Sequence, residues 1–227
     1  MRANRTILAF ALSLALPATA LAAPLDDDAA AVARPKAKHR KRRPVLSGFQ
    51  VPPAKLRAEP LPRPTGHLKL YAINFREGLE VDLYDRDGEF DEQSLEALDH
   101  FWRCRRTGTE KPIDPHLFEI LSLVYDHFDG RTIELVSGFR NQKRVTSFHF
   151  HGSAADIRIP GVSDKQLHQF LAGLDVGGMG LGIYPRGGFV HVDVRPEPSY
   201  RWVDWSPPGS DMGHPHKKAK KKRPLNS

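Results

Sequence analysis

The segment 190–194 constrains the fold of this chain more than any other, because it alternates strictly between apolar and polar residues. Successive side chains of a strand point to opposite faces, so its three valines would face a core while His191 and Asp193 share the other face. A core strand that presents a histidine and an aspartate together predicts a polar site on that face.

Hydrophobic periodicity predicts the other elements of the domain. Alternating runs indicate strands, two of which form a hairpin around Glu77-Gly78. Apolar residues at helical spacing indicate three helices, which begin after Asp91, after Asp114-Pro115 and near Ser163. The predicted strands are residues 68–74, 79–83, 132–136, 155–159, 180–183 and 189–194. This order predicts an α+β domain with a mainly antiparallel sheet on which the helices pack.

The two ends of the chain differ from its body. Arg2 and Arg5 precede an apolar run at residues 7–16 and the small-residue pattern Ala20-Leu21-Ala22, which predicts a cleaved secretory signal peptide. The run is shorter than the about 20 apolar residues that a membrane span needs. The predicted parts are a signal peptide at 1–22, a disordered basic, Pro-rich linker at 23–66, one domain at 67–207 and a disordered basic tail at 208–227.

The net charge of +7 is concentrated in two clusters. Residues 34–43 contain seven Lys and Arg and residues 217–223 contain six, and subtracting these thirteen from +7 leaves −6 for the rest. An acidic body argues against a nucleic-acid-binding domain. In an exported protein, the clusters would contact anionic envelope polymers or lipid headgroups, or would simply be solvated.

Two histidines and one aspartate, remote in the sequence, fit the ligand set of a catalytic zinc. Such a zinc takes three protein ligands and leaves its fourth position to water, and His149, Asp156 and His191 match this set. Bound zinc would lower the pKa of that water to about 7 and polarise a carbonyl, so amide hydrolysis is the expected reaction. Taken alone, a histidine on a strand is more often a hydrogen-bonded structural residue.

Three motifs follow one another along the chain. They are Ser137-Gly138-Phe139-Arg140, the run Ser-x-His-x-x-Gly-x-Ala-x-Asp from Ser147 to Asp156, and a glycine-rich segment at 177–182 that leads to Tyr184-Pro185 and Phe189-Val-His191-Val-Asp193. Together they resemble the zinc D,D-peptidase family of bacterial cell walls, particularly its murein endopeptidase branch, whose fold is shared with the Hedgehog signalling domain. The resemblance covers residues 68–205.

The resemblance implies a role for several residues. His149, Asp156 and His191 match the metal ligands, and Arg140 matches the arginine that binds a substrate carboxylate or carbonyl and stabilises developing negative charge. A guanidinium suits this task because its donors form a fixed fork. A surface salt bridge is the alternative for Arg140. Ser147 is a second candidate for substrate binding, or else shapes the turn.

The general base is less directly indicated, because Gly188 stands where several family members have a glutamate. Asp193 is the first candidate, since it shares a strand face with His191, and His151 is the second, beside His149. Either residue could instead orient a metal ligand. Residues 141–146 form a shorter segment than in much of the family, which leaves substrate preference open.

The sequence therefore predicts an exported, monomeric zinc peptidase of the periplasm that hydrolyses peptide bonds of peptidoglycan. It does not distinguish a D,D from an L,D bond, or an endopeptidase from a carboxypeptidase. A zinc-containing peptidoglycan-binding module without turnover is an alternative from the binding class. A polyanion binder that acts through the basic ends is a third, weakened by the signal peptide and the acidic body.

Overall fold

An eight-stranded sheet organises residues 46–208, the part of the chain that the computed structural model describes. The strands are β1 (Leu46–Gln50), β2 (His67–Ala72), β3 (Glu77–Asp82), β4 (Ile133–Ser137), β5 (Ala154–Arg158), β6 (Met179–Tyr184), β7 (Phe189–Val194) and β8 (Tyr200–Asp204). The helices are α1 (Glu92–Phe101), α2 (Pro115–His127), α3 (Phe148–His151) and α4 (Asp164–Gly173), with a 3-10 turn η1 (Pro53–Lys55). The predicted signal peptide and both basic clusters lie outside the described residues.

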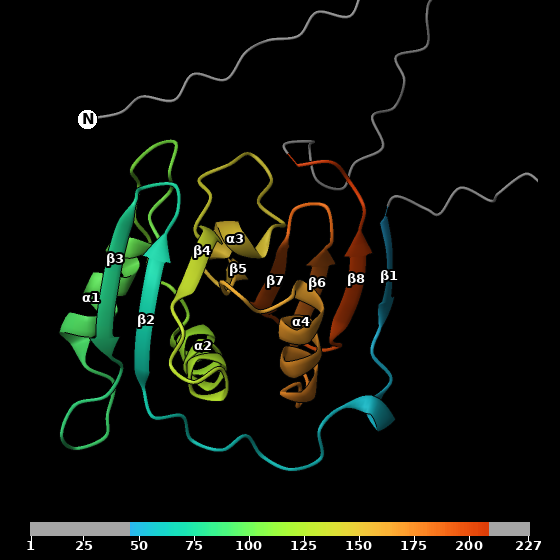
Figure 1. Cartoon of the computed structure of the whole chain (residues 1–227), viewed down its shortest axis with the longest axis horizontal. Helices are drawn as coiled ribbons and strands as arrows, with labels where there is room; N and C mark the ends of the chain where they lie inside the picture. Colours follow the sequence, from blue (N-terminus) through green and yellow to red (C-terminus); the bar gives the residue numbers. More distant parts are fainter. Residues whose placement is uncertain (1–45, 209–227) are drawn as a thin grey trace, which may run out of the picture. The chain divides into compact units, whose positions relative to one another are not determined.

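The strand order is β1-β8-β6-β7-β5-β4-β2-β3, which Figure 1 shows from the blue edge strand to the green hairpin. Neighbouring strands are antiparallel except in the pairs β2–β4 and β6–β8, which are parallel. The prediction of an α+β domain with a mainly antiparallel sheet is confirmed. The predicted hairpin is also present, with β2 and β3 in antiparallel register.

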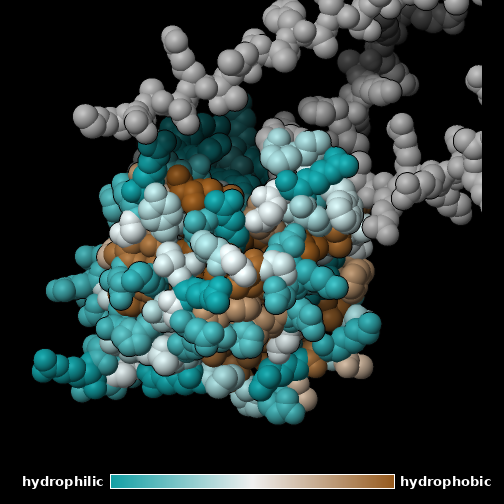
Figure 2. Space-filling model, viewed as in Figure 1, coloured by the Kyte–Doolittle hydropathy of each residue, from teal (hydrophilic) through white to brown (hydrophobic). Residues whose placement is uncertain are grey.

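Helices α2 and α4 pack against one face of the sheet and lie in front of it in Figure 1. Each begins at a predicted capping position: the Asp114 side chain accepts from the His116 amide, and the Ser163 hydroxyl accepts from the Gln166 amide. On the outer side of this helical layer, hydrophilic residues cover most of the raised surface and hydrophobic residues appear mainly between them (Figure 2). Within residues 46–208, no helix combines the length and the apolar composition that crossing a bilayer requires.

The structured part begins earlier than the boundary predicted at residue 67. Strand β1 pairs antiparallel with β8, and beyond it the Val51 amide donates to the Ser199 carbonyl at 2.9 Å. All five residues of β1 are exposed. Backbone hydrogen bonds rather than buried side chains therefore hold this edge strand, which is why it has no apolar periodicity to predict it.

Candidate metal centre

His149, Asp156 and His191 converge on the face of the sheet opposite α2 and α4. Asp156 on β5 and His191 on β7 are direct neighbours in the ladder. Val190 and Val192 belong to the apolar core beneath the helices, so alternation along β7 places His191 on the other face. His149 reaches the same place from α3, the short helix between β4 and β5.

A tight turn returns the chain from α3 to the sheet. Gly152 ends α3 in the left-handed conformation, with φ 76°. A Cβ atom at this position would lie 2.6 Å from the Pro112 carbonyl oxygen. Both the left-handed conformation and the lack of space for a side chain therefore require a glycine here. The turn brings His149 and Asp156 together although only six residues separate them.

The three ligand atoms lie close enough together to share one metal ion. His149 Nε2 lies 3.1 Å from His191 Nδ1 and 3.3 Å from Asp156 Oδ1, and His191 Nδ1 lies 2.9 Å from that same oxygen. Two ligands bonded to one zinc at about 2.0–2.1 Å, at the tetrahedral angle, lie roughly 3.3 Å apart. All three residues are buried. The donor set and its spacing fit zinc.

Second hydrogen bonds orient both imidazoles toward this common point. His149 Nδ1 lies 2.8 Å from the Gly138 carbonyl oxygen, and His191 Nε2 lies 2.8 Å from Asp193 Oδ2. Because a carbonyl and a carboxylate only accept, these nitrogens carry the protons. The other two nitrogens then face Asp156 and, once unprotonated, offer their lone pairs to a metal, which is the arrangement typical of metal-bound histidines.

Burial and charge shift the pKa values of the cluster in different directions. Burial lowers the pKa of His149 and so favours its neutral form. Burial alone would raise the pKa of Asp156, but its interactions with His149 and with the Arg140 guanidinium, and its hydrogen bonds to both imidazoles, hold it well below its usual range. Burial also lowers the pKa of His191, yet its hydrogen bonds to Asp156 and Asp193 outweigh this and raise it to about 9. The cluster therefore favours a positive charge at its centre.

Arg140 and Ser147 lie next to the cluster. The Arg140 Nε donates to Ser137 Oγ at 2.8 Å, and its guanidinium pairs with Asp156 Oδ2, so its partner is a candidate ligand. About a third of the Arg140 side chain is exposed (32%). Ser147 is the N-cap residue of α3, but its side chain makes no capping hydrogen bond.

The prediction that His151 shares a face with His149 is wrong. It assumes a strand, whereas Phe148–His151 is helical, and residues two apart on a helix do not face each other. His149 is buried and His151 is exposed. Asp193 does share a face with His191, as predicted, but it is fully buried (0% exposed) and hydrogen-bonded to His191.

The motifs of the sequence do not single out Arg195, which completes the polar chain behind His191. Its Nε donates to Asp193 Oδ1 at 2.6 Å, and its guanidinium lies over the Phe148 ring at 4.5 Å. Gly180 leaves space for it, since a side chain there would overlap the guanidinium. Arg195 could have been predicted from the apolar–polar alternation of β7, because it is the next polar residue after His191 and Asp193.

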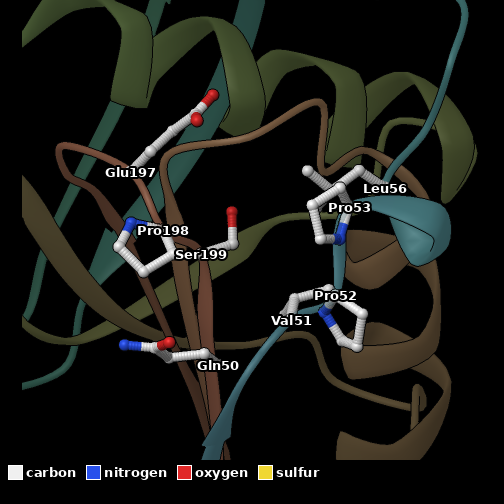
Figure 3. Close-up of a pocket in the computed structure, with 8 residues that line it drawn as sticks. All are labelled: Gln50, Val51, Pro52, Pro53, Leu56, Glu197, Pro198 and Ser199. Atoms are coloured by element: carbon white, nitrogen blue, oxygen red, sulfur yellow. The ribbon is translucent and has the colours of Figure 1, made fainter.

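Two cavities lie away from this cluster. One, of about 340 Å³, lies where β1 runs into η1, with Leu56 and two prolines facing Pro198 and Ser199 across it (Figure 3). The other, of about 620 Å³, is lined partly by α2 and by the segment that precedes β2. Neither is lined by His149, Asp156 or His191, so neither belongs to the candidate metal centre.

Comparison with known proteins adds independent information. Residues 62–200 match the family described as Peptidoglycan L,D-endopeptidase MepK. The chain is 32% identical over 148 residues to Peptidoglycan L,D-endopeptidase MepK of Escherichia coli (strain K12), which covers 60% of this chain and 79% of that protein. It is 30% identical over 128 residues to Probable peptidoglycan L,D-endopeptidase MepK of Haemophilus influenzae, covering 50% and 68% respectively. No solved structure matches the chain significantly.

Proposed function

The chain belongs to the peptidoglycan L,D-endopeptidase MepK family, and we therefore propose that it is an exported zinc peptidase that hydrolyses peptide bonds in peptidoglycan. This membership confirms the resemblance to murein endopeptidases that the three sequence motifs carry. The sequence leaves open whether a D,D or an L,D bond is cut, and whether the enzyme is an endopeptidase or a carboxypeptidase. Because the relatives are described as L,D-endopeptidases, the proposed target is an internal peptide bond that joins an L to a D centre.

One observation carries the proposal: three ligand atoms from three separate elements lie within 3.3 Å of one another, while the other nitrogen of each imidazole is hydrogen-bonded away from them. His149, Asp156 and His191 would hold the zinc. When bound, zinc would lower the pKa of a water to about 7 and polarise the scissile carbonyl. Three protein ligands leave a position for that water, which is typical of catalytic rather than structural zinc sites.

The remaining residues are assigned by their contacts. Asp193 is a positioning residue rather than the general base, because its carboxylate is already held by His191 and Arg195 and has no exposed surface. Arg140 is the substrate-binding candidate, since its guanidinium is partly exposed beside Asp156. Ser147 is half-buried at the start of α3. Its hydroxyl makes no capping hydrogen bond to the helix and is available to the same substrate.

The ends of the chain belong to the same proposal. The predicted signal peptide would export the protein to the periplasm, where the peptidoglycan stems are its substrate. The basic clusters at residues 34–43 and 217–223 would keep the monomeric enzyme near anionic envelope polymers or lipid headgroups.

The proposal is tested with purified sacculi. The exported protein is incubated with them, with and without a chelator, and the released muropeptides are identified by mass. We expect release that stops on chelation and returns with zinc. Synthetic crosslinked peptides that differ only in the configuration at the scissile bond then separate L,D from D,D cleavage. Release that survives complete zinc removal would refute the mechanism.

One observation favours a second candidate function, a zinc-containing module that binds peptidoglycan without cleaving it. Gly188 occupies the position where several family members have a glutamate, and no atom lies within 4 Å of where its Cβ would be. This position therefore supplies no carboxylate that could act as the general base. This candidate predicts one zinc per chain and retention on sacculi, but no released muropeptide.

A further inference from the structure

A row of paired residues crosses the open face of the sheet at the metal centre. Asp156 pairs with His191, His191 with Gly182, and Gly182 with Trp202. Tyr184 follows Gly182 by two residues on β6, so its side chain points to the same face. The β6–β8 side of the centre is thus formed by two aromatic residues, one of which carries a hydroxyl.

Tight packing holds the Tyr184 hydroxyl in one orientation. Trp202 lies across Gly182, where any side chain would overlap the indole, and its ring centroid is 5.0 Å from that of His191. The Trp202 Nε1 donates to the Tyr184 hydroxyl oxygen at 2.9 Å. The Tyr184 ring stacks on Phe189, with centroids 4.5 Å apart and planes 17° apart. A donor held in this way loses little conformational entropy when a ligand binds.

The hydrogen of this hydroxyl is unused. A tyrosine hydroxyl accepts and donates, and among residues 46–208 Tyr184 accepts from Trp202 without donating to any group. Tyr184 is only 8% exposed and its hydrogen bond with Trp202 is partly buried, so a ligand must lie close against the metal centre to meet this hydroxyl. Burial, and then the negative charge of Asp156, raise the pKa of Tyr184 far above its ordinary value, so the hydroxyl stays protonated.

Arg140 and Tyr184 flank the ligand cluster from opposite sides. Arg140 follows β4, and two of its five N–H donors are used by Ser137 and Asp156. Tyr184 lies on β6, beyond His191 in the strand order. Tyr184 has no acceptor for its hydroxyl hydrogen within the described part of the chain.

We propose that the Tyr184 hydroxyl donates a hydrogen bond to the carbonyl oxygen of the scissile peptide group as that oxygen gains negative charge. No bond forms or breaks at Tyr184, and its proton stays on the phenol. The inference rests on the proposed function and adds a catalytic residue to it. Trp202 is then a positioning residue, because its hydrogen bond orients the hydroxyl that donates to the carbonyl oxygen.

The test is Tyr184→Phe, which removes only the hydroxyl. Loss of one such donor typically lowers kcat by about 10²-fold, and we expect that loss with unchanged zinc content and little change in KM. Affinity for a phosphinate peptide, whose anionic oxygens mimic the transition state, should fall by the same factor. Trp202→Phe keeps the hydroxyl but releases it, so we expect a smaller loss, of about tenfold.

Tyr71→Phe is the matched control, because Tyr71 is an exposed tyrosine of β2, a strand without a candidate ligand, and its loss should change neither kcat nor phosphinate affinity. Tyr184→Phe with wild-type kcat and wild-type phosphinate affinity would overturn the proposal. If the wild type releases no muropeptide, the proposed function fails, but phosphinate binding still reports on Tyr184. Should Tyr184→Phe not fold, Trp202→Phe decides by the same two measurements.

Discussion

Strand β7 has two faces that are almost equally buried and are held in different ways. On one face, Val190 and Val192 are both 0% exposed and pack beneath α2 and α4. On the other, His191 is 7% and Asp193 0% exposed, and both are held by hydrogen bonds and charges. The apolar face stabilises the fold in proportion to the apolar surface that it buries. On the polar face, the attraction between the buried charges largely offsets the cost of removing them from water. This face therefore contributes little net stability, and its role is to bind a ligand.

This difference predicts that the two faces respond separately to substitution. Changes on the apolar face should lower the free energy of unfolding and leave the zinc affinity of the folded protein intact. Changes on the polar face should lower zinc affinity and turnover in the folded protein. The following predictions test this separation, beginning with the largest effect.

His149→Ala removes a candidate ligand and should abolish both zinc binding and hydrolysis. A metal supplies several kcal/mol of transition-state stabilisation, so we expect turnover to fall by about 10³-fold or more. Zinc per chain is measured by mass spectrometry on the sample that is assayed on sacculi. A variant that retains full zinc content would remove His149 from the ligand set.

Leu121→Ala acts on the apolar face. Leu121 is fully buried in α2, and truncating such a residue typically costs about 3 kcal/mol. We expect this loss in chemical denaturation of the metal-free protein, with the zinc affinity of the folded form unchanged within about twofold. A parallel fall in intrinsic zinc affinity would show that the two faces are coupled.

Asp193→Asn removes the charge behind His191 while nearly preserving shape. Loss of such a partner typically weakens metal binding by about 10- to 100-fold, which chelator competition measures. Asp82→Asn is the matched control, because Asp82 pairs with His67 on the exposed hairpin, far from the centre in strand order. Equal zinc affinity in both variants would contradict the positioning role of Asp193.

Zinc affinity should rise with pH. The pKa of His191 is raised to about 9, so its imidazole holds a proton at pH 7 that zinc must displace. One displaced proton corresponds to an increase of about tenfold per pH unit between pH 7 and 8.5, levelling off above 9. The same proton stabilises the metal-free fold: its contribution is complete below about pH 6.5 and is lost as pH rises through about 9. Affinity that does not change over this range would contradict the assignment.

The sequence predicts most of this fold because its elements have local signals. The alternation of β7 and the caps at Asp114 and Ser163 specify both register and boundaries. Strand β1 has no such signal, because an exposed edge strand is specified by its partner's backbone. Helix α3, with four residues, is too short for any helical period to appear.

The candidate ligands are predictable from residue types and spacing, but their supporting contacts are not. The Gly138 carbonyl that orients His149 is a backbone group, and every residue has one. Trp202 and Tyr184 come together only through the parallel pairing of β6 with β8, which no local pattern encodes. Long-range strand pairing thus decides which polar groups surround the candidate metal centre.

His151→Ala gives the smallest expected effect and tests the local structure most directly. His151 and His149 lie on the same four-residue helix, but one side chain is exposed and the other faces Asp156. Exposed substitutions usually change stability by less than about 0.5 kcal/mol, so we expect zinc content and turnover within about twofold of wild type. A loss like that of His149→Ala, in both zinc content and turnover, would contradict the separation of the two histidines by this helix.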